Sequence, residues 1–271
     1  MKKETKNVII TFVALAALVA IGYTGVMVYS GASPSFYTVE SGSMRHSDSS
    51  KIGVIDTGDM VIVRDPSKTD IITYIEGHGT GYRMFGDYGD VILYKDKLGR
   101  TIIHRAILDM EVVDVDGSDK KWWKVHGLDK YTGEWSCGAL NNTNYNNEPL
   151  TGSLILYDFG VKNTRLEIKL ATNFNGVTKG DRGYLTMGDS NNPNYDAALV
   201  TEDMLVAVAA LEIPWVGIIK LYVSGTNTDQ IPSNTLPSFI AAFVAFVLIV
   251  AILSVVHDSY VKKKDARKKK Q

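Results

Sequence analysis

The chain has 271 residues, a single cysteine, and 29 lysines and arginines against 30 aspartates and glutamates, which gives a formal net charge of −1. This balance gives no electrostatic indication of a nucleic-acid partner, so none is expected. One cysteine excludes an intramolecular disulfide and argues against a structural zinc site. The length leaves room for one large domain or two small ones between two apolar ends.

Two uncharged runs are long enough to cross a bilayer as helices. Residues 8–27 read VIITFVALAALVAIGYTGVM, and residues 238–256 read SFIAAFVAFVLIVAILSVV. About 20 apolar residues make one span. The first run exceeds the ~7–15 residue apolar core of a secretory signal peptide, so we expect an uncleaved anchor. A buried core helix is the alternative for the second run, although globular helices rarely lack polar residues for so long.

Basic residues flank both runs on their outer sides, in segments 1–7 and 257–271. Positive residues near the ends of a span stay in the cytoplasm. This rule predicts two cytoplasmic tails and an extracytoplasmic domain at 28–237, in a multi-pass protein of the cell membrane, or of the endoplasmic reticulum membrane in a eukaryote. The terminal lysine run is expected to contact anionic membrane lipids.

Residues 28–237 have a composition typical of strands and turns. A polar, glycine- and asparagine-rich stretch at about 116–182 indicates a long insertion with a strand of its own, and 65–87 indicates a smaller excursion. A short helix is expected after Thr201, where an acidic first turn follows a capping residue. We therefore expect a mainly β domain. Runs rich in β-branched and aromatic residues predict strands at 59–63, 90–94, 101–107, 154–157 and 218–223.

The sequence Ser41-Gly42-Ser43-Met44 follows the first apolar run by about a dozen residues. A serine becomes a nucleophile when a base takes its proton and donors hold the developing oxyanion. Glycine before Ser43 would let the backbone turn and approach a substrate closely. Taken alone the motif is weak, because serine–glycine clusters are usually loops.

The best candidate for the base is His104, which lies in the strand-like run TIIHRAI. A lone histidine in a strand is more often structural. However, His46 and His78 lie in polar loop sequence and His126 lies in the insertion. His257 is expected on the cytoplasmic side, away from an external site.

The candidate acids lie in YLTMGDSNNPNYD at 184–196, a turn-rich segment after a short strand. An aspartate that accepts the second imidazole N–H would fix the tautomer and stabilise the imidazolium. Asp189 and Asp196 both qualify, and Asp181 lies just upstream. The plain alternative is that Asp189 and its neighbouring asparagines form an Asx-type turn.

In their order and spacing these elements resemble signal peptidase I of the archaeal and endoplasmic-reticulum type. The bacterial housekeeping branch has lysine where this chain has His104. Three departures stand out: Arg45-His46 where a proline usually follows Met44, the extra residue Ser190, and the length of the insertion. The blocks that carry the resemblance are SGSM at 41–44, GDMVIV at 58–63, DVILY at 90–94, IIHRAI at 102–107, YLTMGDSNN at 184–192, Asp196, and IPWVGIIKL at 213–221.

The resemblance implies a signal-peptidase-type β catalytic domain between two transmembrane helices, acting as a serine endopeptidase without cofactor or metal. Ser43 would be the nucleophile, His104 the base and Asp196 the acid that orients it, with Asp189 as a supporting carboxylate. The Ser41 hydroxyl and the Ser43 backbone N–H would form the oxyanion hole. Whether Asp196 or Asp189 orients His104 is left open.

The implied substrates are exported preproteins, bound as an extended segment beside a strand and cut after small residues, in membrane lipid and near the translocon. Two alternatives stand beside this reading. One is a specialised relative that processes a narrow set of precursors, and the other is a non-catalytic anchored β domain.

Overall fold

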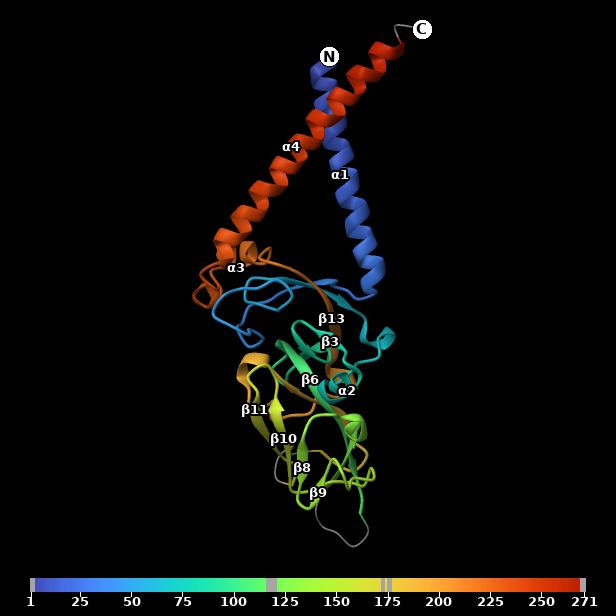
Figure 1. The fold of residues 1–271 in the computed structure, drawn as a ribbon, viewed down its shortest axis with the longest axis vertical. Helices are drawn as coiled ribbons and strands as arrows, with labels where there is room; N and C mark the ends of the chain where they lie inside the picture. Colours follow the sequence, from blue (N-terminus) through green and yellow to red (C-terminus); the bar gives the residue numbers. More distant parts are fainter. Residues whose placement is uncertain (1–2, 116–120, 172–173, 175–176, 269–271) are drawn as a thin grey trace.

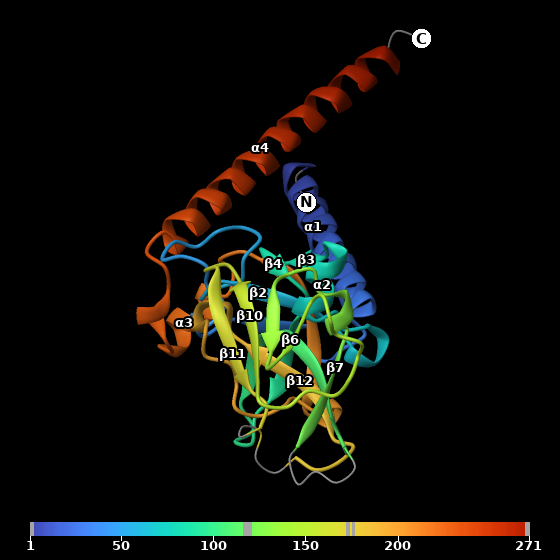
Figure 2. The same ribbon diagram turned by 60° about the horizontal axis from the view of Figure 1, so that its bottom comes forward.

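The computed structural model describes residues 3–115, 121–171, 174 and 177–268. It is a mainly β domain from which two apolar helices project. Both helices leave the same end of the domain, and both termini lie at the far end of the helices (Figures 1 and 2). The first residues of the expected insertion, 116–120, and the terminal Lys2, Lys269 and Lys270 lie outside the described residues.

Helix α1 is Lys3–Ser30 and helix α4 is Thr235–Lys268. Within them, Phe12–Ser30 and Thr235–His257 are apolar and long enough to cross a membrane, and neither stretch is buried in the protein. The helices thus begin before and extend beyond the uncharged runs at 8–27 and 238–256. α1 meets the domain where the Tyr23 ring stacks on Phe36, with 6.0 Å between ring centroids.

A seven-stranded antiparallel sheet forms the end of the domain from which the two apolar helices project, with strand order β1-β2-β13-β5-β6-β12 and β7 paired to β6. β6 is the longest strand of this sheet: β5 pairs with its first half, β7 with its second half, and β12 with its other edge. The strands are β1 (Phe36–Thr38), β2 (Met60–Arg64), β5 (Val91–Lys95), β6 (Thr101–Val113), β7 (Trp122–His126), β12 (Arg182–Met187) and β13 (Leu205–Ile213).

The expected insertion builds a second, four-stranded sheet of order β11-β10-β8-β9 at the end of the molecule away from the helices (Figure 1). Its apolar face packs with the distal half of β6 and with β7 into one core that includes Trp123, Trp135 and Phe159. The strands are β8 (Trp135–Cys137), β9 (Leu140–Asn141), β10 (Ser153–Phe159) and β11 (Thr164–Lys169).

The smaller excursion at 65–87 contains a 3₁₀ turn at Pro66–Lys68, helix α2 (Tyr74–Thr80), strand β3 (Arg83–Met84) and the start of strand β4 (Asp87–Tyr88). α2 begins with a full capping box between Thr73 and Glu76. The excursion returns the chain to β5 beside the start of β6.

Two sequence expectations are wrong. The helix expected after Thr201 is one 3₁₀ turn at Glu202–Met204 followed by β13, because that segment fills the gap between β2 and β5 and pairs with both. The strand expected at 218–223 is helix α3, Ile218–Ser224. Ile218 and Leu221 are its buried residues, a spacing of three that suits a helix and not a strand.

Candidate active site

His104 lies near the start of β6 and contacts Asp196, from the segment that follows β12. The imidazole Nδ1 is 2.7 Å from Asp196 Oδ2. The His104 side chain is only 9% exposed and that of Asp196 is 28% exposed. Because a carboxylate accepts hydrogen bonds, Nδ1 donates, and in the neutral imidazole Nε2 is left with a free lone pair. This is the tautomer that a general base requires.

Asp196 is held in place by three further bonds. Its backbone N–H donates to the Thr186 carbonyl at 2.9 Å. Its Oδ2 accepts from the Thr186 hydroxyl at 2.6 Å and from the Tyr94 hydroxyl at 2.9 Å. Burial alone would raise the pKa of Asp196, but the hydrogen bond and charge of His104 and the two hydroxyls lower it below its usual value. Asp196 is therefore an anion beside the imidazole of His104.

Ser43 packs against Gly188, the residue that follows β12. Met187 pairs with Arg105, so continuing the antiparallel register by one residue sets Gly188 opposite His104. An ideal Cβ on Gly188 would lie 2.9 Å from the Ser43 Cβ and 2.5 Å from the Ser43 carbonyl oxygen. Alternation along an extended chain points that Cβ to the same face as Thr186, the face of His104 and Asp196.

The hydroxyls of Ser41 and Ser43 lie 3.3 Å apart. In the described part of the chain, this is the hydrogen bond that Ser43 Oγ makes, and His104 Nε2 makes none. Ser43 and Met44 are the central residues of a turn closed by Arg45 N–H donating to the Gly42 carbonyl at 3.3 Å. Met44 is buried at 1% exposure and anchors the turn in the core.

Asp189 lies on the other side of β6 from Asp196. His104 and Arg105 are consecutive strand residues, so their side chains point to opposite faces. Asp189 accepts from Arg105 Nε at 2.8 Å and from a terminal nitrogen of the same guanidinium at 2.6 Å. It also lies 2.8 Å from His46 Nε2. Despite its burial, which would raise the pKa of Asp189, the charge and hydrogen bonds of Arg105 lower it.

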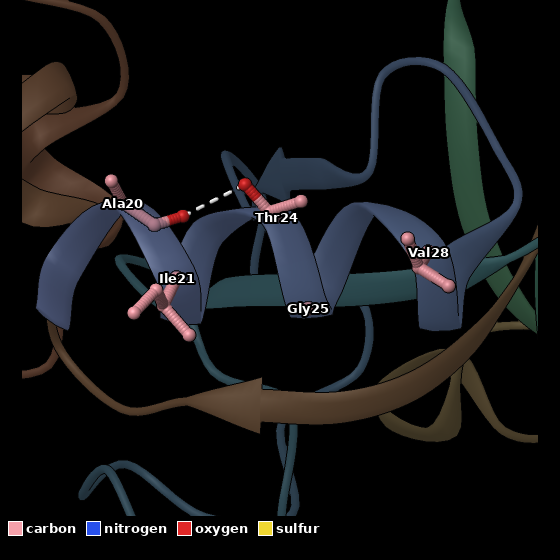
Figure 3. A pocket seen from close by; sticks show the side chains of 5 residues that line it. All are labelled: Ala20, Ile21, Thr24, Gly25 and Val28. Atoms are coloured by element: carbon pink, nitrogen blue, oxygen red, sulfur yellow. Dashed lines mark hydrogen bonds between the residues drawn. The ribbon is translucent and has the colours of Figure 1, made fainter. Parts of the chain in front are cut away.

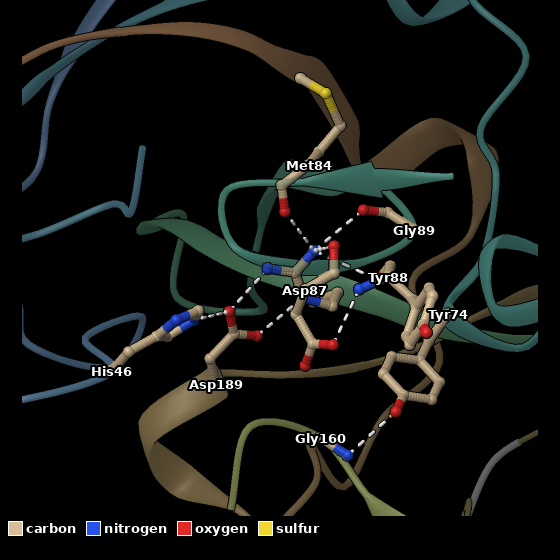
Figure 4. Close-up of polar contacts among 9 residues, drawn as sticks. His46, Tyr74, Met84, Asp87, Tyr88, Gly89, Gly160 and Asp189 are labelled. Carbon is tan, nitrogen blue, oxygen red and sulfur yellow. Dashed lines mark hydrogen bonds and ion pairs between the residues drawn. The ribbon is translucent and has the colours of Figure 1, made fainter. Parts of the chain in front are cut away.

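The fully buried Arg105 also organises the loop around β3 and β4. One of its terminal nitrogens donates to the carbonyls of Met84 at 3.0 Å, Tyr88 at 3.2 Å and Gly89 at 2.9 Å. Figure 4 shows Met84, Tyr88 and Gly89 on one side of this cluster and Asp189 beside His46 on the other. The two aspartates thus have separate environments: Asp196 contacts His104, and Asp189 contacts Arg105 and His46.

His46 is the residue of this site that sequence reasoning missed. It was assigned to a polar loop, whereas its side chain is 12% exposed and paired with Asp189. A signal was present in the sequence: Arg45-His46 is one of the departures from the pattern that the chain resembles. Sequence order alone does not show that position 46 meets position 189.

Asp181 belongs to the turn that enters β12, where its carboxylate accepts from the backbone N–H of Thr178 at 2.6 Å. That is the end of β12 opposite to Gly188, so Asp181 is not part of the site. Cys137 is buried in the distal core, and its thiol lies 3.3 Å from the Thr151 carbonyl. Among the residues that the structure describes, no group of three His, Cys, Asp or Glu side chains is arranged to hold a metal ion.

An open cleft of about 370 Å³ lies beside the His104–Asp196 pair. Its apolar wall includes Leu98, Ala197 and Met204. A second hollow lies on the exposed face of α1, lined by Ala20, Ile21, Thr24, Gly25 and Val28 (Figure 3). The Thr24 hydroxyl there donates to the Ala20 carbonyl of its own helix at 2.8 Å, so this hollow presents no reactive group.

Comparison of the chain with protein-family models, with curated proteins and with solved structures finds no significant match. The case for a function therefore rests on the geometry of the site and on the motifs.

Proposed function

We propose that the protein is a membrane-bound serine endopeptidase that removes signal peptides from exported preproteins. The observation that carries the proposal is the 2.7 Å contact between His104 Nδ1 and Asp196, on the sheet face where Ser43 packs against Gly188. In this mechanism His104 Nε2 takes the proton of the Ser43 hydroxyl as the oxygen attacks the scissile carbonyl. His104 then gives the proton to the leaving amine.

The surroundings of Ser43 supply donors for the oxyanion. The Ser41 hydroxyl lies 3.3 Å from Ser43 Oγ, and together with the Ser43 backbone N–H it stabilises the tetrahedral intermediate. Asp196 compensates the positive charge that His104 acquires. Asp189 supports the site from the opposite face of β6, through Arg105 and His46.

The two apolar helices support a membrane location. Both leave the domain at one end, so both tails are on one side of the bilayer and the domain is on the other (Figure 1). Ser43 follows α1 by 13 residues, and we expect it to lie close to the bilayer surface. A preprotein whose apolar segment is still in the membrane would present its small residues there.

Topology is tested separately from activity. Basic residues flank both helices, so the tails are expected in the cytoplasm. Protease added to intact cells or right-side-out vesicles should leave a tag after Gln271 intact. Digestion of that tag from outside would contradict the assignment of α4 as a span.

The decisive experiment is cleavage of a preprotein with an Ala-X-Ala site by the purified protein in detergent or liposomes. Ser43→Ala and His104→Ala should each reduce turnover by about 10³-fold or more. Ser47→Ala is the matched control, because Ser47 lies in the same loop and its hydroxyl bonds locally to the Ser49 carbonyl. His104→Lys should not restore turnover, because a lysine acts as a base only in a desolvated pocket that lowers its pKa.

If Ser43→Ala cleaves as well as the wild type, Ser43 is not the nucleophile, and if neither protein cleaves the preprotein, the chain is the non-catalytic alternative. Replacing the residue before the cut by phenylalanine should abolish processing, since shallow pockets exclude large side chains. The long four-stranded insertion favours a second candidate, a peptidase for few precursors. A panel of precursors distinguishes broad from narrow processing.

A further inference from the structure

We propose that His46 is a positioning residue for Ser43: by bonding to Asp189, it fixes the turn that presents the nucleophile. The inference rests on the proposed function for its catalytic consequence, and on the geometry alone for its structural one. His46 lies three residues after Ser43, and its ring nitrogen Nε2 is 2.8 Å from Asp189 Oδ2.

The contact between His46 and Asp189 is one of two hydrogen bonds that join the Ser43 segment to the segment after β12. The Ser190 backbone N–H donates to the Ser43 carbonyl at 2.8 Å. Asp189, the residue before Ser190, accepts from His46. Segment 43–46 is therefore joined to segment 189–190 at both of its ends, once through the backbone and once through a side chain.

The acceptor of this contact is itself rigid. Asp189 is 5% exposed and is held by two nitrogens of the Arg105 guanidinium at 2.8 and 2.6 Å. Since Asp189 is ionised, it accepts, and Nε2 of His46 is the donor. A hydrogen bond to a charged and fixed partner restricts the position of the His46 ring more than a bond to a mobile surface group would.

A second surface fixes the plane of the imidazole. Gly86 has φ +85°, and a Cβ there would lie 2.8 Å from His46 Cε1 and 3.0 Å from Nδ1. The absence of a side chain at position 86 leaves the space that the ring fills. His46 thus joins three segments: the turn that contains Ser43, the turn after β12, where Asp189 lies beside it (Figure 4), and the loop of β3 and β4.

Loss of the His46 bond should affect the rate of the reaction more than the binding of the precursor. Displacement of a reacting group by about 1 Å costs on the order of 100-fold in rate. Without the His46 bond, the Ser43 turn keeps its anchor at Met44 but loses the contact that fixes its far end. Turnover should fall while binding of the precursor changes little.

The experiment compares His46→Leu, which removes the donor, with His46→Gln, whose side-chain amide nitrogen can reach the place of Nε2. His46→Asn is polar but too short to reach, and it replaces His46→Leu if that variant does not fold. His126→Leu is the matched control, because His126 makes a similar contact with Glu111 at 3.1 Å near the distal end of the sheet. Each protein is assayed on the Ala-X-Ala preprotein and by amide hydrogen exchange.

We expect kcat of His46→Leu and His46→Asn to fall by about tenfold or more with KM within about twofold, and His46→Gln to recover most of the loss. The Ser190 amide should exchange faster in the first two variants and at the wild-type rate in His46→Gln and His126→Leu. Normal kcat and unchanged Ser190 exchange in His46→Asn would overturn the inference and leave the proposed function standing. If the wild type cleaves nothing, the proposed function fails, and Ser190 exchange alone then decides whether His46 fixes the turn.

Discussion

Gly188 lies directly against Ser43, with room for a hydrogen but not for a methyl group between them. A Cβ on Gly188 would be 2.5 Å from the Ser43 carbonyl oxygen and 2.9 Å from the Ser43 Cβ. Its own backbone is extended, with φ −72° and ψ 136°, so the glycine is required by the close approach and not by its conformation. The position of the proposed nucleophile therefore depends on a residue that contributes no side chain.

Gly188→Ala should displace Ser43 from His104 and reduce kcat on the preprotein by about 100-fold. The matched control is Gly183→Ala in β12, the strand that Gly188 follows, where a Cβ would meet the Val200 carbonyl oxygen at 2.7 Å. That control should lower the melting temperature without a selective loss of kcat. Equal loss of kcat in both variants would mean that general damage to β12, and not the position of Ser43, causes the effect.

Asp196→Asn should reduce kcat by about 10³- to 10⁴-fold, because the neutral amide neither fixes the His104 tautomer nor stabilises its charged form. Asp181→Asn is the control and should change kcat by less than about twofold, since Asp181 only closes the turn before β12. Steady-state kinetics on folded protein tests both. Near-normal turnover of Asp196→Asn would remove Asp196 from the mechanism.

Asp189→Asn should act on stability more than Asp196→Asn does. It leaves Arg105 buried at 1% exposure without a counter-charge, and breaking such a pair costs about 3–5 kcal/mol. Arg165→Gln is the control: it breaks a pair with Glu167 in which the two side chains are 55% and 36% exposed, and such pairs are worth up to about 1 kcal/mol. Denaturant unfolding measures both. Equal losses of unfolding free energy in Asp189→Asn and in the control would contradict the distinction between buried and exposed pairs.

Gln230 connects the turn that contains Ser43 to the segment that leads into α4. Its side-chain oxygen accepts from the Gly42 N–H at 3.2 Å, and its carbonyl accepts from Arg45 at 3.4 Å. Gln230→Ala should lower kcat by about three- to tenfold, because a backbone donor beside Ser43 loses its partner. Asp229→Ala, at an exposed neighbouring position, should leave kcat unchanged. Unchanged kcat in Gln230→Ala would show that Met44 and His46 suffice to hold the turn.

Stability should fall as pH rises from about 5 to 8. Burial raises the pKa of Asp59 and of Glu212 to about 7, well above the ~4 of the unfolded chain. A carboxyl group with a raised folded pKa binds its proton more tightly in the folded state, so its contribution to stability is present at low pH and is lost as pH rises through this window.

Glu212→Gln should flatten this profile, measured as melting temperature in detergent at several pH values. Glu167→Gln, which alters an exposed glutamate that pairs with Arg165 on β11, should leave the slope unchanged. A wild-type melting temperature that rises from pH 5 to 8 would contradict the sign of the effect.

Local sequence predicted the elements whose pattern is decided by nearest neighbours. The uncharged runs at 8–27 and 238–256 lie within α1 and α4, because a stretch of about 20 apolar residues needs no tertiary contact to form a helix. The runs rich in β-branched residues form strands β2, β5 and β6, because strand preference, like helix formation in an apolar run, depends on local sequence. The predictions for the segments after Thr201 and Gly217 are wrong. Pairing with both β2 and β5 makes the first segment a strand, and burial of Ile218 and Leu221 makes the second a helix.

The features of the candidate site also divide into those that the sequence determined and those that the tertiary structure decided. The sequence by itself determined which groups were available: a serine after a glycine, a histidine in a strand, and aspartates in one turn-rich segment. Only the tertiary structure decided their partners, because strand alternation sends His104 and Arg105 to opposite faces of β6 and so separates Asp196 from Asp189. The contact between His46 and Asp189 joins residues 143 positions apart in the chain, a distance that only the folded sheet closes.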